Sequence, residues 1–251
     1  MLAPNPGPFT GSGTNTWLLD SDGELVVIDP GPIDDGHASA ISEAVGGRDV
    51  VTVMVTHTHE DHAPLANPLA RQWQVSASGH APGRDFDPDI RLTEGATVPV
   101  GNTMLEVVHT PGHSDDHLCF KVGSVLFTGD HIMGGSSVMV EDMVSYIDSL
   151  ERLARIELTR LYPGHGEIID DPAGTIDWYL AHRRQRERQI LDAIERGVTT
   201  LPDIVEDVYS EVDPALLPLA MRSATAHVGK LISEGLVRSD GDLVRLPGDA
   251  G

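Results

Sequence analysis

Residues 53–64 read VMVTHTHEDHAP, an apolar run followed by three histidines, one aspartate and one glutamate within six residues. The preceding residues, DVVTVMV, are rich in β-branched side chains and predict a buried strand. A buried group of titratable side chains needs a partner, because a protein core cannot satisfy it with apolar contacts. Imidazole and carboxylate groups are ligands of divalent metals, so a metal ion is the partner that suits this segment best.

The composition limits what such a site can belong to. The chain has 251 residues, enough for one large core or for one core and a small appendage. Its 17 basic and 39 acidic side chains give a formal net charge of −22. Such an acidic surface repels phosphate backbones and anionic membranes, which argues against a general nucleic-acid-binding or membrane-bound protein.

Cysteine usage and the N-terminus indicate a compartment. The only cysteine, Cys119, cannot form an internal disulfide, and its apolar context HLCFKV predicts a small buried side chain. The first residues, MLAPNPGPFTGSGTN, contain neither a basic start nor an apolar segment, and no later run reaches membrane-spanning length. We therefore expect a cytoplasmic protein.

The first part of the chain alternates short β-branched runs with helical patterns, which predicts a layered α/β core. The helical patterns lie at 37–45, 63–72 and 143–156. After residues 170–174 the pattern changes to a long charged helix, two further helical stretches and a closing hairpin, LVRSDGDLVRL. Helices followed by a two-stranded hairpin are typical of a winged helix. We predict domains at 1–174 and 175–251.

The C-terminal part carries few features of a DNA reader. Thr200 and Asp203 have the spacing of a capping box and predict a helix start. The long helix holds an arginine cluster interleaved with acidic residues, which favours a solvated face with ion pairs over a nucleic-acid patch; the cluster is Arg183, Arg184, Arg186 and Arg188. The second helix that follows offers only Arg222 and Lys230 for phosphate contacts. We expect this part to shape the pocket or an interface.

The histidine-rich loop alone cannot complete a metal site. Alternate residues of a chain leaving a strand face the same side, so His57 and His59 are expected to converge while Asp61 and His62 turn towards a neighbouring point. Further ligands must come from other strand ends. Three candidates each follow a glycine, which lets the backbone turn sharply: His113 in HTPGHS, Asp130 in LFTGDH and His165 in LYPGHG.

Taken in order, HTHEDH, PGHS, TGD and PGHG resemble the motifs of the metallo-β-lactamase superfamily, whose fold is an αββα sandwich. The resemblance implies such a sandwich in 1–174 and a small winged-helix-like α+β domain in 175–251. It implies a first metal on His57, His59 and His113, a second on Asp61, His62 and His165, and Asp130 bridging both. Two Zn²⁺ ions are the expected cofactors, with Mn²⁺ or Fe²⁺ as alternatives.

Segments outside the ligands are similar to the β-lactamase-like protein 2 group, which carries a C-terminal winged-helix-like domain; they are NPGPFTGSGTNTWLL, IDPG and YLAHRRQRERQI. Animal members of that group are implicated in cleaving single-stranded RNA, and many bacterial relatives are assigned only as metal-dependent hydrolases. Three functions remain open: a hydrolase of small esters, lactones, thioesters or amides, an endoribonuclease acting on single-stranded RNA, and a non-catalytic winged-helix regulator.

For a hydrolase, two metal ions about 3.5–4 Å apart would present hydroxide to an electrophilic carbon. We expect catalytic roles for Asp61, which would orient the hydroxide, for the bridging Asp130, and for His131, which could reach the substrate. Two divalent ions less two carboxylates and one hydroxide leave about one positive charge, which suits a small, possibly anionic substrate. Asp29 is expected to accept a hydrogen bond behind the site, and the chain could form oligomers.

Overall fold

The computed structural model describes residues 1–135 and 137–248, and their contacts divide the chain into two compact units. The first unit contains Met1–Pro111, Asp115–Val138 and Ile156–Ala173. The second contains Gly112–Ser114, Met139–Arg155 and the chain from Gly174 onward. This division separates the chain near residue 174 and also assigns Met139–Arg155 to the second unit. The domain boundaries themselves stay a prediction.

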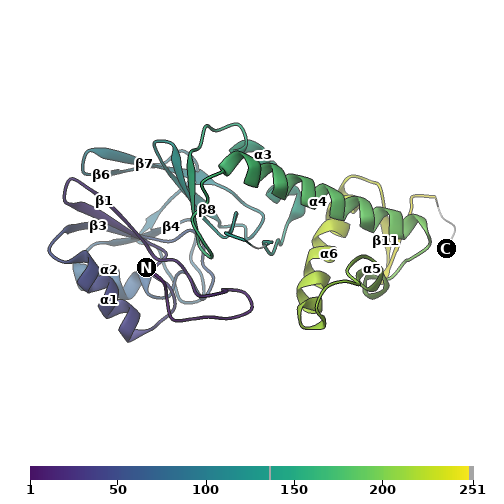
Figure 1. Ribbon diagram of the computed structural model, residues 1–251, viewed down its shortest axis with the longest axis horizontal. Coiled ribbons are helices and arrows are strands. Elements are labelled where there is room, and N and C mark those ends of the chain that lie inside the picture. Colours follow the sequence, from purple (N-terminus) through teal and green to yellow (C-terminus); the bar gives the residue numbers. More distant parts are fainter. Residues whose placement is uncertain (136, 249–251) are drawn as a thin grey trace. The chain divides into compact units, whose positions relative to one another are not determined.

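Two five-stranded sheets form the first unit (Figure 1). The first sheet has the order β1(Trp17–Ser21), β2(Glu24–Ile28), β3(Asp49–Met54), β4(Ser76–Gly79), β5(Ile90–Arg91), with β2 to β5 parallel. The second has the order β10(Arg160–Pro163), β9(Val125–Gly129), β8(Leu118–Val122), β7(Thr103–His109), β6(Thr97–Val100), and only β9 and β10 in it pair in parallel.

Strand β2 shows how its residues build two layers. Successive side chains of a strand point to opposite faces. Leu25 and Val27 belong to the cluster that contains residues of α1(Asp35–Val45) and α2(Ala66–Trp73), whereas Val26 packs in a cluster with residues of the second sheet. Figure 1 shows α1 and α2 on the side of the first sheet opposite to β6 and β7. The predicted layered α/β core is confirmed.

The second unit contains five helical segments and a hairpin among its described residues: α3(Met143–Leu153), most of α4(Pro172–Glu195), α5(Leu201–Val208), the 3₁₀ turn η1(Pro214–Leu216), α6(Leu217–Ser233), β11(Arg238–Asp240) and β12(Leu243–Arg245). The predicted helix start is confirmed, because the Thr200 hydroxyl accepts a hydrogen bond from Asp203 N at 3.3 Å. Ile190, Ile204 and Leu231 join α4, α5 and α6 in one buried core. Within residues 1–135 and 137–248, no helix has both the length and the apolar character needed to cross a membrane.

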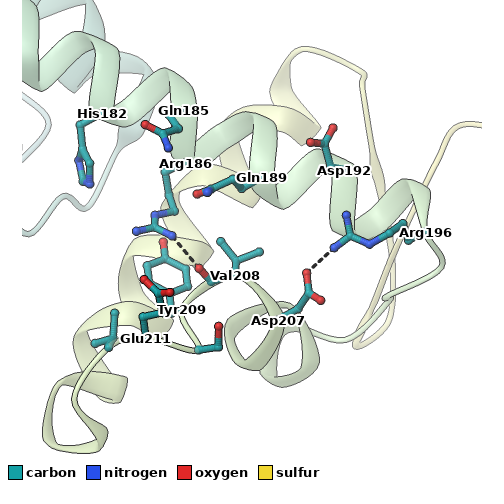
Figure 2. A pocket seen from close by; sticks show the side chains of 12 residues that line it. His182, Gln185, Arg186, Gln189, Asp192, Arg196, Asp207, Val208, Tyr209 and Glu211 are labelled. Carbon is teal, nitrogen blue, oxygen red and sulfur yellow. Dashed lines mark hydrogen bonds and ion pairs between the residues drawn. The ribbon is translucent and has the colours of Figure 1, made fainter.

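The arginine cluster on α4 makes contacts within the protein. Arg183 is only 2% exposed and its guanidinium lies 5.4 Å from the centre of the Tyr146 ring, so the solvated-face interpretation is wrong for this residue. Arg186 donates from Nη1 to Val208 O at 2.7 Å and lies 4.2 Å above the Tyr209 ring (Figure 2). These arginines stabilise helix packing because their planar groups stack on aromatic rings.

The cations of α6 are already paired with carboxylates. Lys230 Nζ lies 3.0 Å from Glu187 and 2.6 Å from Glu234, and Arg222 lies 3.8 Å from Glu141. Binding of phosphates by these cations would require breaking those pairs on a strongly acidic chain.

We therefore expect no sub-micromolar affinity for duplex DNA at physiological salt, measured by fluorescence anisotropy. Tight binding that disappears in the double variant Arg222→Ala, Lys230→Ala would contradict this expectation and support the regulator hypothesis.

Candidate metal centre

The site forms where parallel strands end. Because β2 and β3 are parallel, Asp29 and the loop 57–62 leave the first sheet at the same edge. Strands β9 and β10 are also parallel, so Asp130 and His165 follow neighbouring strand ends of the second sheet. A backbone hydrogen bond of 2.7 Å from Gly164 N to Gly129 O, between the two residues that precede these side chains, holds the ends together.

Four side chains of the first unit converge there: Asp61, His62, Asp130 and His165. His165 Nε2 lies 3.1 Å from Asp61 Oδ2, 3.3 Å from Asp130 Oδ1 and 3.2 Å from His62 Nε2. His62 Nε2 lies 3.4 Å from each of the two carboxylate oxygens. A tetrahedron with about 2.0–2.1 Å from centre to vertex, the usual length of zinc bonds to nitrogen and oxygen, has edges of roughly 3.3–3.4 Å. The cluster therefore fits a metal site.

The histidine tautomers agree with this geometry. His62 Nδ1 lies 2.9 Å from Asp29 Oδ2, and His165 Nδ1 lies 3.1 Å from the carbonyl oxygen of Gly13. Each acceptor binds an Nδ1–H, so each imidazole turns Nε2 towards the cluster. Metal-binding histidines are commonly fixed in this way by a carboxylate or carbonyl on the other nitrogen. The expected role of Asp29 as an acceptor behind the site is confirmed.

The second pair of histidines lies beside this cluster. His57 Nε2 and His59 Nδ1 are 2.9 Å apart, which confirms the predicted convergence of the two rings. The Thr56 hydroxyl donates to Asp29 Oδ2 at 2.8 Å, so it accepts from His57 Nδ1 at 3.0 Å. Glu60, which stands between the ligands in the sequence, is exposed and pairs with Arg84.

The third residue predicted for the first metal, His113, belongs to the second unit. Its Nδ1 donates to Met139 O at 2.7 Å, so coordination would use Nε2. Gly112 before it has a φ of 131°, and a Cβ at this position would lie 2.4 Å from the Cα of Tyr146. The predicted need for glycine is confirmed here, and the assignment of His113 to the first site stays a prediction.

Two buried histidines, His117 and His131, lie next to Asp130. His117 Nδ1 lies 2.9 Å from Thr110 Oγ1, and His117 Nε2 accepts a 3.1 Å hydrogen bond from Asp130 N. His117 therefore fixes the backbone that carries Asp130. His131 is 0% exposed and its ring centre lies 5.8 Å from that of His117. Its catalytic role stays a prediction.

Charge within the cluster is balanced between carboxylates and imidazoles. Burial raises the pKa of Asp130, but His62 and His165 outweigh burial and hold that pKa well below its usual range. Burial lowers the pKa of His165, but hydrogen bonds to Asp130 and Asp61 raise it overall to about 9. Protons on the imidazoles thus neutralise the carboxylates in the absence of a metal, and a divalent cation would replace these protons.

Comparison with known proteins places this arrangement in a family. Residues 9–86 and 77–165 match the Metallo-beta-lactamase superfamily, and residues 200–245 match the Beta-lactamase associated winged helix domain. This chain belongs to the metallo-β-lactamase superfamily. Both the fold and the resemblance predicted from the motifs are confirmed.

Similar proteins align with nearly the whole length of this chain. A Beta-lactamase-like protein 2 homolog from Drosophila melanogaster is 35% identical over 95% of this chain and 88% of its own length. An atrochrysone carboxyl ACP thioesterase from a Cryptosporiopsis species is 30% identical over 93% of this chain and 79% of its own. A metallo-beta-lactamase family protein from Thermus thermophilus superimposes with a TM-score of 0.82 at 21% identity, over 98% of this chain and 97% of the other.

The metallo-β-lactamase unit also uses residues that the motif analysis did not single out. Thr14 Oγ1 lies 3.5 Å from Asp61 Oδ2, and Asn5 holds Thr14 through two hydrogen bonds of 2.9 and 3.0 Å. Asp116 Oδ2 accepts from Thr58 N at 2.9 Å and so fixes the histidine loop. Asn5 and Thr14 lie in the segment NPGPFTGSGTNTWLL, but asparagine, threonine and aspartate are ordinary turn residues, so the sequence assigned no individual role to them.

Substitution of Gly164 by alanine should damage the site directly. The added Cβ would lie 2.6 Å from Asp130 Oδ1 and 2.7 Å from His62 Cε1, so both side chains must move. We expect roughly 10- to 100-fold weaker metal binding, by chelator competition. Gly47→Ala is the matched control, because its Cβ would meet nothing within 4 Å. Unchanged affinity in folded Gly164→Ala would show that the cluster does not bind the metal.

Metal affinity should depend on pH. His165 has a pKa raised to about 9 in the metal-free site, so below that pH a metal must displace its proton. We expect the apparent affinity to rise as the pH approaches about 9, with protons released on binding. Calorimetry in buffers of different ionisation enthalpy measures this release. Affinity independent of pH would show that the imidazoles are unprotonated before binding.

Proposed function

We propose that this chain is a dinuclear-metal hydrolase of small esters, lactones, thioesters or amides, with thioesters as the foremost class. The observation that carries the proposal is the group of four donor atoms in which each imidazole nitrogen lies 3.1–3.4 Å from the other imidazole nitrogen and from both carboxylate oxygens, with the His57–His59 pair beside it. Membership of a superfamily of generally hydrolytic enzymes supports the same reaction type.

The ligand sets follow from the donors and the motif order. We assign the second metal to Asp61, His62 and His165, the first to His57, His59 and His113, and the bridging position to Asp130. All donors are nitrogen or oxygen, which suits Zn²⁺ and leaves Mn²⁺ and Fe²⁺ as alternatives. Two divalent ions held there would supply a water of lowered pKa and Lewis acidity towards a substrate oxygen.

Protein side chains would position the reacting groups. The Asp61 side chain is 26% exposed, whereas those of Asp130 and His165 are 10% and 4% exposed, so Asp61 borders the solvent side of the cluster. Its Oδ2 faces the imidazoles, and Oδ1 would accept a hydrogen bond from the attacking water and orient it. His131, which directly follows Asp130, is the proposed proton donor to the leaving group.

The substrate class rests on relatives and on charge. A thioesterase is 30% identical to this chain over 93% of its length. A formal net charge of −22 repels a long polyanion such as RNA, whereas the excess positive charge of a loaded centre would attract a small carboxylate-bearing thioester.

Metal analysis and a hydrolysis panel test the proposal together. We expect two metal ions per chain and turnover of acyl thioesters above that of lactones, β-lactams and single-stranded RNA. Asp130→Ala should lose more activity than His165→Ala, because it removes a ligand from both ions. At most one tightly held ion in metal-replete protein would contradict the dinuclear centre. Cleavage of single-stranded RNA alone would favour the endoribonuclease.

A further inference from the structure

A polar pocket lies within the second unit, between one face of α4 and the residues that end and follow α5 (Figure 2). Its volume of about 510 Å³ falls in the range of small-molecule sites, roughly 300–1,000 Å³. The α4 wall consists of residues three or four positions apart, which share one face of a helix; they are His182, Gln185, Arg186, Gln189 and Asp192. Because this α4–α5 pocket is lined mainly by polar side chains, it suits a polar ligand.

Arg186 is held in a fixed position in the α4–α5 pocket, but its charge is not neutralised. Its guanidinium lies 4.2 Å from the centre of the Tyr209 ring and donates from Nη1 to Val208 O at 2.7 Å. Tyr209 is 6% exposed and its hydroxyl donates to Ser223 Oγ at 3.2 Å, so the ring beneath the guanidinium is fixed as well. In the described ranges of the chain, no carboxylate forms an ion pair with Arg186. Its positive charge and its remaining N–H donors are thus available to an anionic group.

Two carboxylates of the same pocket also lack a basic partner. Asp192 and Glu211 form no ion pair with any residue that the structure describes. Arg196 and Asp207, by contrast, neutralise each other at 2.5 Å. A purely anionic ligand would be repelled by the two carboxylates, and a purely cationic ligand by Arg186. The charge pattern therefore favours a ligand that carries both a positive and a negative group.

Neutral hydrogen-bonding groups complete the lining of the pocket. The amides of Gln185 and Gln189 are exposed and form no hydrogen bond with other described residues. His182 stacks on Trp178 with 5.2 Å between ring centres, and its Nδ1 is buried without a hydrogen-bond partner in the described part of the chain. Burial, followed by the charges of neighbouring arginines, lowers the pKa of His182 to about 4, so the ring is neutral at neutral pH. These groups match amide or hydroxyl functions of a ligand.

We propose that the α4–α5 pocket binds a small zwitterion of the amino-acid class, whose carboxylate contacts Arg186 and whose ammonium group contacts Glu211. A guanidinium binds a carboxylate through two parallel hydrogen bonds, and a carboxylate accepts hydrogen bonds from an ammonium group. Gln185, Gln189 and His182 bind the polar side chain of the ligand. None of these residues is a proposed metal ligand, so the site is additional to the hydrolase function proposed above.

Calorimetry on the full-length chain with matched probes tests the class of ligand. L-Glutamine carries both charges and an amide, whereas glutaramate lacks its amino group and γ-aminobutyramide lacks its carboxylate. We expect L-glutamine to bind one-to-one, with the same affinity in metal-loaded and metal-depleted protein, and each analogue to bind roughly tenfold more weakly. Equal binding of L-glutamine and glutaramate would show a simple anion site and overturn the proposal. Absence of L-glutamine binding would overturn it as well.

Single substitutions locate the site. Arg186→Gln should weaken L-glutamine binding roughly tenfold, and Glu211→Gln roughly two- to fivefold, because Glu211 is the more exposed of the two. Arg188→Gln and Glu206→Gln are the matched controls and should bind as the wild type, since both residues are exposed and lie outside the pocket. If circular dichroism shows that Arg186→Gln fails to fold, the comparison of Glu211→Gln with Glu206→Gln decides. Unchanged affinity in folded Glu211→Gln would overturn the proposal.

Discussion

The carboxylate of Asp29 ties the first sheet to the candidate metal centre. It is 1% exposed and accepts hydrogen bonds from Thr56 N, from the Thr56 hydroxyl and from His62 Nδ1, at 2.7, 2.8 and 2.9 Å. Its φ of 50° is uncommon for a residue with a side chain, and such a conformation persists only where surrounding contacts fix it. Asp29, which directly follows β2, thus positions both Thr56 in the loop after β3 and the ring of His62.

Electrostatic attraction explains why buried imidazoles and carboxylates occur together in the candidate metal centre. The cluster combines two carboxylates with two buried imidazoles, and the pKa of His62 is raised well above its usual value because the carboxylates outweigh the effect of burial. Removing such charges from water is costly unless opposite charges are adjacent. A divalent cation satisfies the same electrostatic need as the protons do. The carboxylates of the cluster therefore require positive charge beside them, from imidazole protons or from a bound divalent cation.

The C-terminal unit has a core of its own, and charged side chains lie within it or beside it. Glu187 lies between Lys230 and the fully buried His227, and burial lowers the pKa of His227. Arg183 and Arg186 stack on aromatic rings. The sequence pattern favoured a solvated face for these two arginines, but in the structure both contribute to helix packing. The winged-helix match over residues 200–245 indicates a fold and does not by itself indicate a function.

The sequence by itself determined the layered α/β fold, the winged-helix ending and the residues that make up the candidate metal centre. These follow from local patterns: β-branched runs that end in His57–His62, and a glycine before Asp130 and His165 that allows a sharp or closely packed turn. Apart from Asp29, which the sequence already indicated, tertiary structure decided which side chains support those ligands. The bond from His165 to Gly13 spans 152 residues, and the burial of Arg183 depends on Tyr146 of another helix. Periodicity reports which face of an element is polar, and it contains no information on which distant segment covers that face.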